Sequence, residues 1–143
     1  MFYPDTDHLP TLLQRLICHA EERPTQIAYR FLSEKGEEAG HLTYASLLRQ
    51  AMDSAWLIHQ FSEPGDRILL LLPTGRDYIV SLWACVFAGV TAVPLYRPTG
   101  KRMLHRLKNI AADTRPSLIL SEEKWSQSLF ELSQQSPKNS VST

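Results

Sequence analysis

The feature that most constrains the fold is a short, uninterrupted apolar run from Ile68 to Leu72. A half-exposed strand would alternate apolar and polar residues, and five residues are too few for a helix core. Strands that are buried on both faces are typical of parallel sheets. A turn at Pro64-Gly65-Asp66 precedes the run, and a helix breaker at Pro73-Thr74-Gly75 follows it. The segment therefore predicts a strand over residues 67–72 that is covered on both sides.

Two further strands follow at the spacing of parallel neighbours. A parallel partner needs a crossover of a dozen or more residues, and residues 76–89 supply one before a second strand at 91–96. Arg115-Pro116 ends another helical stretch before a third strand at 118–120. The apolar residues at helical spacing in these crossovers are Tyr78, Ile79, Leu82, Trp83 and Val86 in the first, and Met103, Leu104, Leu107, Ile110 and Ala111 in the second. The order βαβαβ, with right-handed connections, is the expected unit.

The amino-terminal third predicts a helix, a hairpin and a second helix. The first helix begins near Pro10, ends before Pro24 and packs on a sheet; its apolar positions are Leu9, Leu12, Leu13, Leu16, Ile17 and Ala20. Strands at 27–32 and 41–44 flank a charged turn at 34–40, which is too long for a tight primed turn. A helix over 45–60 is expected to place Leu48, Met52, Ala55 and Ile58 inward.

The fold class is therefore α/β: a three-layer βαβαβ unit with a mainly parallel sheet, plus an amino-terminal helix and β-hairpin. A chain of 143 residues is the size of one domain, which we place at residues 1–133. Glu122 to Gln134 has the pattern of a last helix, with Trp125, Leu129, Phe130 and Leu132 as its apolar residues. Residues 134–143 are polar and are expected to form a disordered tail.

Charge and composition exclude several classes of protein. The formal net charge is zero, with ten acids and five bases in residues 1–66 and the reverse in residues 67–143. A general nucleic-acid binder would be strongly basic, so no nucleic-acid partner is expected. No apolar run approaches the roughly 20 residues of a transmembrane helix, and acids at Asp5 and Asp7 argue against a signal peptide. Cys18 and Cys85 are expected to be buried free thiols, which fits the cytoplasm.

The loop from Pro73 to Arg76 lies where open α/β sheets bind ligands, and Arg76 could add a cation there. It has one glycine and no following Lys-Ser or Lys-Thr pair, so it is no phosphate loop. An ordinary strand-to-helix turn, with Asp77 favouring the first helical turn, is the preferred interpretation. Anion binding at this loop remains the alternative.

One group of basic residues stands out near the third strand. It comprises Arg97, Lys101, Arg102, His105, Arg106, Lys108 and Arg115. A solvated helix face is the preferred interpretation over a contact with an anion or a protein. The five histidines (His8, His19, His41, His59 and His105) have no i, i+4 pair, and no serine lies in a nucleophile elbow. We therefore assign no catalytic, cofactor-binding or metal-binding residue.

Four segments resemble the fatty acyl-AMP ligases, within the acyl-adenylate-forming ligases that also include the acyl-CoA synthetases. Residues 42–48 (LTYASLL) are similar to an early L-T-Y-x-x-L element, and residues 65–71 (GDRILLL) to the following strand. Residues 87–98 (FAGVTAVPLYRP) are similar to the family's G-x-x-A-V-P-x-Y-P-P segment, with Arg97 in place of the first of two prolines. Residues 106–116 match the helix before the next strand, and the resemblance covers about residues 9–125.

The resemblance implies the amino-terminal part of such a ligase, within a partial subdomain of its fold. The parent activates a fatty acid with ATP and magnesium to acyl-AMP and passes the acyl group to an acyl carrier protein. In this family the phosphate loop, the ribose-binding acid and the mobile lysine lie in later motifs that residues 1–143 lack. The chain alone is therefore expected to be inactive and to bind no cofactor of its own. Its expected role is that of a scaffold that supports one wall of the acyl site.

Two other expectations follow. The alternative function is a stand-alone α/β module that binds an anion or a protein. As part of a larger sheet, the chain should also leave an edge uncovered and self-associate, and the apolar segment Ile68 to Leu72 is the expected hazard.

Overall fold

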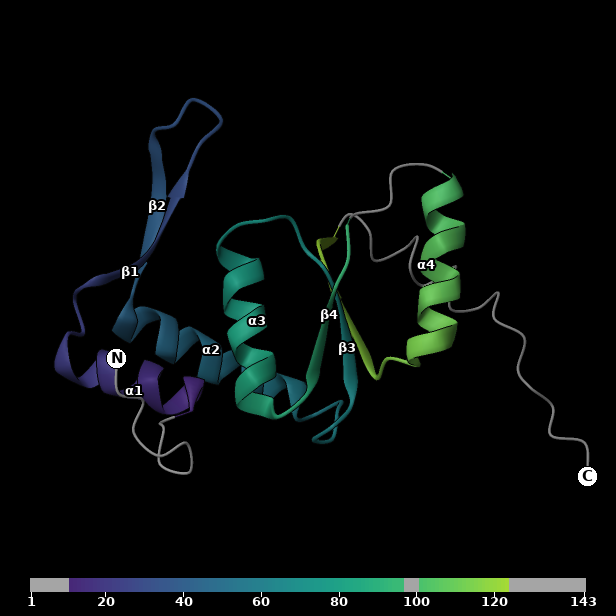
Figure 1. Cartoon of the computed structure of the whole chain (residues 1–143), viewed down its shortest axis with the longest axis horizontal. Helices are drawn as coiled ribbons and strands as arrows, with labels where there is room; N and C mark the ends of the chain where they lie inside the picture. The colour runs from purple at the N-terminus through teal and green to yellow at the C-terminus, as the bar shows by residue number, and fades with distance from the viewer. Residues whose placement is uncertain (1–10, 97–100, 124–143) are drawn as a thin grey trace, which may run out of the picture.

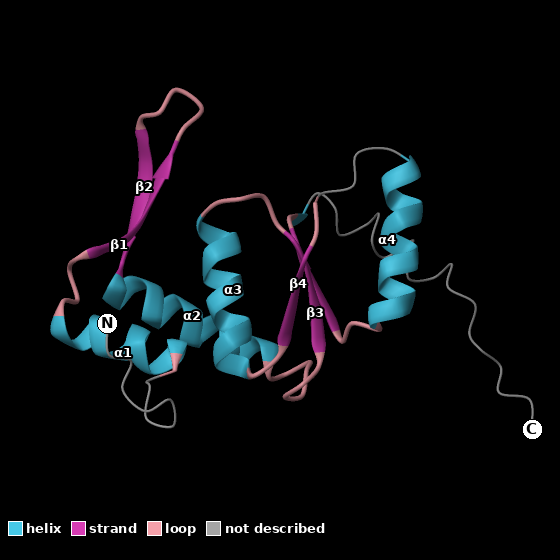
Figure 2. Cartoon of the chain, in the orientation of Figure 1, coloured by secondary structure: helices cyan, strands magenta, loops and turns pink. Residues whose placement is uncertain are grey.

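The computed structural model describes residues 11–96 and 101–123, with the side chains of residues 101–104 left aside. Its elements occur in the order α1 (Leu12–Glu22), β1 (Ile27–Leu32), β2 (Glu38–Thr43), α2 (Tyr44–Ile58), β3 (Arg67–Leu71), α3 (Arg76–Ala88), β4 (Thr91–Pro94), α4 (Lys101–Thr114) and β5 (Leu118–Ser121). β1 and β2 form an antiparallel hairpin, and β3, β4 and β5 form a parallel sheet (Figures 1 and 2). The predicted α/β class, with its βαβαβ unit, helix and hairpin, is confirmed.

β3 is the central strand, hydrogen-bonded to β4 on one side and to β5 on the other. Among the residues that the structure describes, the sheet order β4-β3-β5 makes β4 and β5 the edge strands. The expectation that Ile68 to Leu72 would be an unpaired hazard is therefore wrong, because two neighbours satisfy this strand's backbone groups. Pro94 is the last residue of β4, where the missing N–H of proline costs little.

The two faces of the sheet carry different helices. Ile68 and Leu70 pack with α3 and the end of α2, whereas Leu69 and Leu71 pack with Leu107 of α4. All four strand residues are fully or almost fully buried. This alternation explains why the sequence is apolar at every position: each face of β3 lies under helices (Figure 1).

A separate apolar cluster joins α1, the hairpin, α2 and α3. Its buried members are Leu16, Leu42, Leu47 and Val80, one from each of α1, β2, α2 and α3. α3 therefore has apolar neighbours on two sides, the sheet and this cluster. α1 packs against α2, and its Leu16 also packs with residues of the hairpin sheet, as expected, whereas Leu12 remains exposed.

Local sequence signals explain the helix ends. Thr11 caps α1 and Thr43 caps α2, each through a capping box in which the threonine and the third helical residue bond each other's backbone amides. α3 ends at Gly89, whose φ of 66° is left-handed, as glycine allows. A Cβ on Gly89 would meet Pro64 at an ordinary 3.7 Å, so the backbone conformation and not crowding favours glycine here.

Some predicted positions differ from the structure. α2 buries Leu47, Ala51, Ala55 and Ile58, so Met52 faces solvent. The small alanine side chains allow α2 to pack closely against α3. The buried positions are therefore Leu47 and Ala51, each one residue before the expected Leu48 and Met52. Val86 of α3 is also exposed.

The hairpin turn is shorter than predicted, because β2 begins at Glu38. Gly36 has a φ of 79°, and the amide of Ser33 donates to the carbonyl of Glu37 at 2.8 Å. The predicted helix after Glu122 and the tail at residues 134–143 lie outside the described residues.

The two cysteines occupy different environments. Cys85 is buried against the sheet as predicted, and burial raises the pKa of its thiol to about 11. Cys18 is exposed on α1, so the prediction of a second buried thiol is wrong. Its apolar sequence neighbours Leu16 and Ile17 suggested burial, but on α1 the buried positions are Leu16 and Ala20.

The central position of β3 makes Leu70 a sensitive probe of the core. Leu70→Ala should lower the free energy of unfolding by about 2 to 5 kcal/mol, the range for truncating a buried leucine. Chemical denaturation measures this change, and Leu32→Ala, at a side chain 61% exposed, is the matched control. A loss below about 1 kcal/mol for Leu70→Ala would contradict burial of the strand.

The cysteines predict a simple reactivity pattern. Because the thiolate is the reacting form, a thiol reagent at neutral pH should modify Cys18 rapidly and Cys85 only after unfolding. Cys18→Ser should abolish the rapid phase, and Cys85→Ser should leave it unchanged. Rapid labelling that survives in Cys18→Ser would show that the core around α3 opens readily.

Candidate functional site

The carboxyl ends of β3 and β4 form a crevice at the sheet edge. The chain leaves β3 toward α3 on one face and leaves β4 toward α4 on the opposite face. Adjacent strands whose connections diverge in this way create the usual ligand crevice of open α/β sheets. Fold topology alone therefore marks this edge as the candidate site (Figure 1).

The crevice is an open hollow of about 620 Å³, within the usual size range of ligand pockets. Its described lining comes from the ends of β3 and β4 and from the first turn of α3: Leu72, Pro73, Thr74, Tyr78, Pro94, Leu95 and Tyr96. A smaller hollow of about 230 Å³ adjoins it and adds Arg106, Leu107 and Ile110 from α4. The larger hollow has polar and apolar surface in similar amounts, whereas the smaller one is mainly apolar; the polar side chains include hydroxyl groups and one guanidinium.

Most of these lining residues were assigned to strands, helices or turns in the sequence without a binding role. The available signal was the position of prolines: Pro73 and Pro94 follow or end two successive parallel strands, and such ends share one edge of a sheet. Tyr78 was interpreted as a core residue of the crossover helix. It packs against the core and also lines the crevice.

Arg76 does not point into this crevice. Its Nη2 atom donates a hydrogen bond to the carbonyl oxygen of His41 in β2, at 2.8 Å, and its side chain ties α3 to the hairpin. α3 begins at Gly75 without a side-chain cap, with Asp77 in its first turn. The preferred interpretation, a plain strand-to-helix turn, agrees with this geometry.

The described members of the basic group do not all lie together. α4 has 14 residues, which corresponds to a length of about 20 Å. Arg106 lines the hollow beside the carboxyl ends of the strands, whereas Arg115 follows α4, close to the start of β5. His105 is exposed. Arg97 lies outside the described residues, and only the backbone is described for Lys101 and Arg102.

The histidines that the structure describes lie in separate places. His19 of α1 lies beside Tyr44 with ring centroids 5.0 Å apart, and its Nδ1 is 3.0 Å from the guanidinium of Arg23. His59 and His105 are exposed, and His8 lies outside the described ranges. Residues 11–96 and 101–123 contain no group of three or more His, Cys, Asp or Glu side chains placed to hold a metal ion.

The hairpin carries a small ionic group whose members do not line the crevice. Glu38 accepts a hydrogen bond from Nδ1 of His41 at 2.9 Å and pairs with Arg30. The hydrogen bond from His41, followed by the charge of Arg30, lowers the pKa of the Glu38 carboxyl. The group is solvent-exposed and links the two strands, so its arrangement is structural.

The geometry of the described residues is suited to binding a ligand in the crevice and holding it in place. The crevice offers apolar walls, tyrosine and threonine hydroxyls and the Arg106 guanidinium. Within the described ranges, no helix is long and apolar enough to cross a bilayer.

Comparison with known proteins gives the family. Residues 18–143 match the model of the AMP-binding enzymes. The long-chain-fatty-acid–AMP ligase FadD32 of Mycolicibacterium smegmatis is 29% identical over 140 residues, covering 96% of this chain and 22% of that protein. The medium-chain-fatty-acid–[acyl-carrier-protein] ligase JamA of Moorena producens is 34% identical over 121 residues, and the match covers 82% of this chain and 20% of JamA.

The fold comparison agrees with the sequence comparison. A crystal structure of a fatty acid AMP ligase from Legionella pneumophila superposes with a TM-score of 0.76 at 26% identity, covering 88% of this chain and 22% of that one. The chain thus spans about a fifth of the length of the relatives it matches. The resemblance seen in residues 42–48, 65–71 and 87–98 is confirmed, and the chain belongs to the AMP-binding enzyme family, with fatty acyl-AMP ligases among its relatives.

Proposed function

We propose that the chain is the amino-terminal scaffold of a ligase that activates a fatty acid with ATP to acyl-AMP and passes the acyl group to an acyl carrier protein. The observation that carries the proposal is the match of residues 18–143 to the AMP-binding enzymes, together with relatives named as fatty acid–AMP and acyl-carrier-protein ligases. The substrate, the acceptor and the remainder of the ligase as a partner are inferred from those relatives.

The role of the chain itself is to build one wall of the acyl site. Leu72, Leu95 and the rings of Tyr78 and Tyr96 supply the apolar part of the crevice lining, against which a hydrocarbon chain could lie. The buried β3 strand fixes the positions at which these loops leave the sheet. A rigid scaffold of this kind keeps binding residues on loops in register.

The described residues do not fit the chemistry of ATP activation. They contain no glycine-rich phosphate loop and no cluster of potential metal ligands, so no step involving ATP or magnesium is assigned to them. Placement of charge-stabilising groups around the reacting atoms supplies most of the rate in such reactions. We therefore infer that residues 1–143 are inactive without the rest of the ligase.

A cytoplasmic location is part of this proposal. The thiols of Cys18 and Cys85 are both free, and an exposed free thiol such as Cys18 is best maintained in a reducing compartment.

The test is fatty-acid-dependent exchange of pyrophosphate into ATP. The purified 143-residue chain should show no exchange above background, while a full-length fatty acyl-AMP ligase assayed beside it provides the positive control. Exchange that depends on fatty acid and co-purifies with this chain would refute its role as an inactive scaffold.

The gene downstream of codon 143 tests the parent assignment separately. A continuing or shifted reading frame that encodes a Ser/Thr/Gly-rich loop ending in Pro-Lys-Gly is the expected result. Absence of any such frame would remove the ligase parent and favour a stand-alone binding module.

A further inference from the structure

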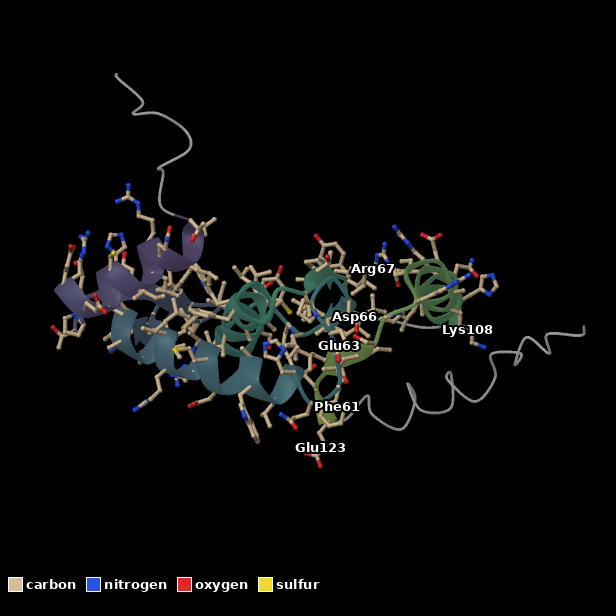
Figure 3. All side chains as sticks on the ribbon, turned by 90° about the horizontal axis from the view of Figure 1, so that it is seen from below. Phe61, Glu63, Asp66, Arg67, Lys108 and Glu123 are labelled. Carbon is tan, nitrogen blue, oxygen red and sulfur yellow. The ribbon has the colours of Figure 1, made fainter. Side chains whose placement is uncertain are left out.

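A separate hollow of about 220 Å³ lies among α1, the hairpin, α2 and α3, and is here named the α1 hollow. It shares no lining residue with the crevice or with the smaller hollow beside the crevice. Leucines and an alanine supply part of its walls, and the rest comes from Arg15, His19, Tyr29, Tyr44 and Trp83. In Figure 3, α1 (purple) lies beside α2, at the end of the molecule away from the labelled Asp66 and Lys108.

The rings of the α1 hollow are held by contacts between elements that are distant in sequence. Nε1 of Trp83 in α3 donates a hydrogen bond to the hydroxyl oxygen of Tyr29 in β1, at 3.2 Å. The rings of His19 in α1 and Tyr44 in α2 have centroids 5.0 Å apart, with their planes tilted by 59°. Leu16, which also lines the hollow, belongs to the buried cluster that joins these elements. The walls are therefore preformed, as in most small-molecule sites.

Two of these side chains have a hydrogen-bond donor to offer. The guanidinium of Arg23 lies 3.0 Å from Nδ1 of His19, and because arginine has no acceptor, neutral His19 accepts at Nδ1 and carries its proton on Nε2. The oxygen of Tyr29 accepts from Trp83, so its own O–H is still a donor. None of the residues that line the hollow is acidic. The polar character of the site is therefore that of a donor to an anion.

Arg15 adds a positive charge to the same hollow. Residues 15 and 19 are four apart on α1, so their side chains share one face of the helix, and both line the hollow. Arg15 is exposed, and among the residues that the structure describes its guanidinium forms no ion pair. A guanidinium matches a carboxylate through two parallel N–H···O bonds. The charge therefore favours a carboxylate over a neutral or cationic ligand.

We propose that the α1 hollow binds a small carboxylate whose body is a single aromatic ring. The rings of Tyr29, Tyr44 and Trp83 offer stacking and edge-to-face contacts to such a ring, and Arg15 and His19 offer charge and a donor to its carboxylate. A volume of about 220 Å³ is below the roughly 300 Å³ at which pockets for larger ligands begin, which excludes a long acyl chain. The site lies apart from the crevice, so this proposal does not rest on the proposed function.

Benzoate is the probe, titrated into the isotope-labelled chain and followed by nuclear magnetic resonance. The indole N–H signal of Trp83 should shift and saturate, with a dissociation constant on the order of 1 mM or lower for a ligand of this size. Acetate lacks the ring and benzyl alcohol lacks the charge. Each should bind at least about tenfold more weakly, because stacking and the charge-assisted hydrogen bond both contribute to affinity.

A substitution at an exposed position tests the role of Arg15 without disturbing the core. Arg15→Gln should weaken benzoate binding by about tenfold, since it removes a charge-assisted bond, and should leave benzyl alcohol binding unchanged. Arg49→Gln removes another exposed arginine, on α2, that does not line the hollow, and this matched control should change neither affinity. Circular dichroism confirms that both variants are folded.

Three results would overturn the proposal. The first is the absence of a saturable shift with benzoate. The second is equal affinity for benzoate, acetate and inorganic phosphate, which would reveal a surface arginine that attracts any anion. The third is equal weakening of benzoate binding by Arg15→Gln and Arg49→Gln, which would place the bound benzoate outside the α1 hollow.

Discussion

The structure depends on one strand, β3, that pairs on both sides and is covered on both faces. Its side chains alternate between two apolar clusters, and its backbone joins β4 and β5. Burial of four consecutive apolar residues, at roughly 1.5 to 3 kcal/mol for each large side chain, supplies much of the driving force for the βαβαβ unit. The crevice exists because the loops leaving β3 and β4 diverge to opposite faces of this strand's sheet.

Much of this arrangement could be predicted from the residues alone. The run from Ile68 to Leu72 indicated a strand covered on both faces, and the helical spacing that follows indicated parallel crossovers. Periodicity was less able to choose between adjacent helix positions: Ala51 and Ala55 of α2 are buried where Met52 was expected. The choice depends on how closely α2 approaches α3, which is a tertiary property.

The order of the strands could not be predicted, and this decided the interpretation of the edges. Alternation of strands and helices in a sequence does not determine the order of the strands in the sheet. The third strand could pair with the second strand or with the free side of the first. Placement of β5 beside β3 pairs Ile68 to Leu71 on both sides and makes β5 an edge strand of the described sheet. Likewise, Arg76 was correctly located before a helix, but its bond to the carbonyl of His41 comes from a hairpin distant in sequence.

The central claim is that β3 lies in the middle of the sheet, and amide hydrogen exchange measured residue by residue tests it most directly. The amides of residues 68–71 should be the slowest to exchange in the chain, because both neighbours of the strand must separate before they open. Amides of the two-stranded hairpin β1–β2 should exchange faster, since that hairpin pairs with no further strand in the described structure. Exchange at residues 68–71 as fast as in the hairpin would contradict the account.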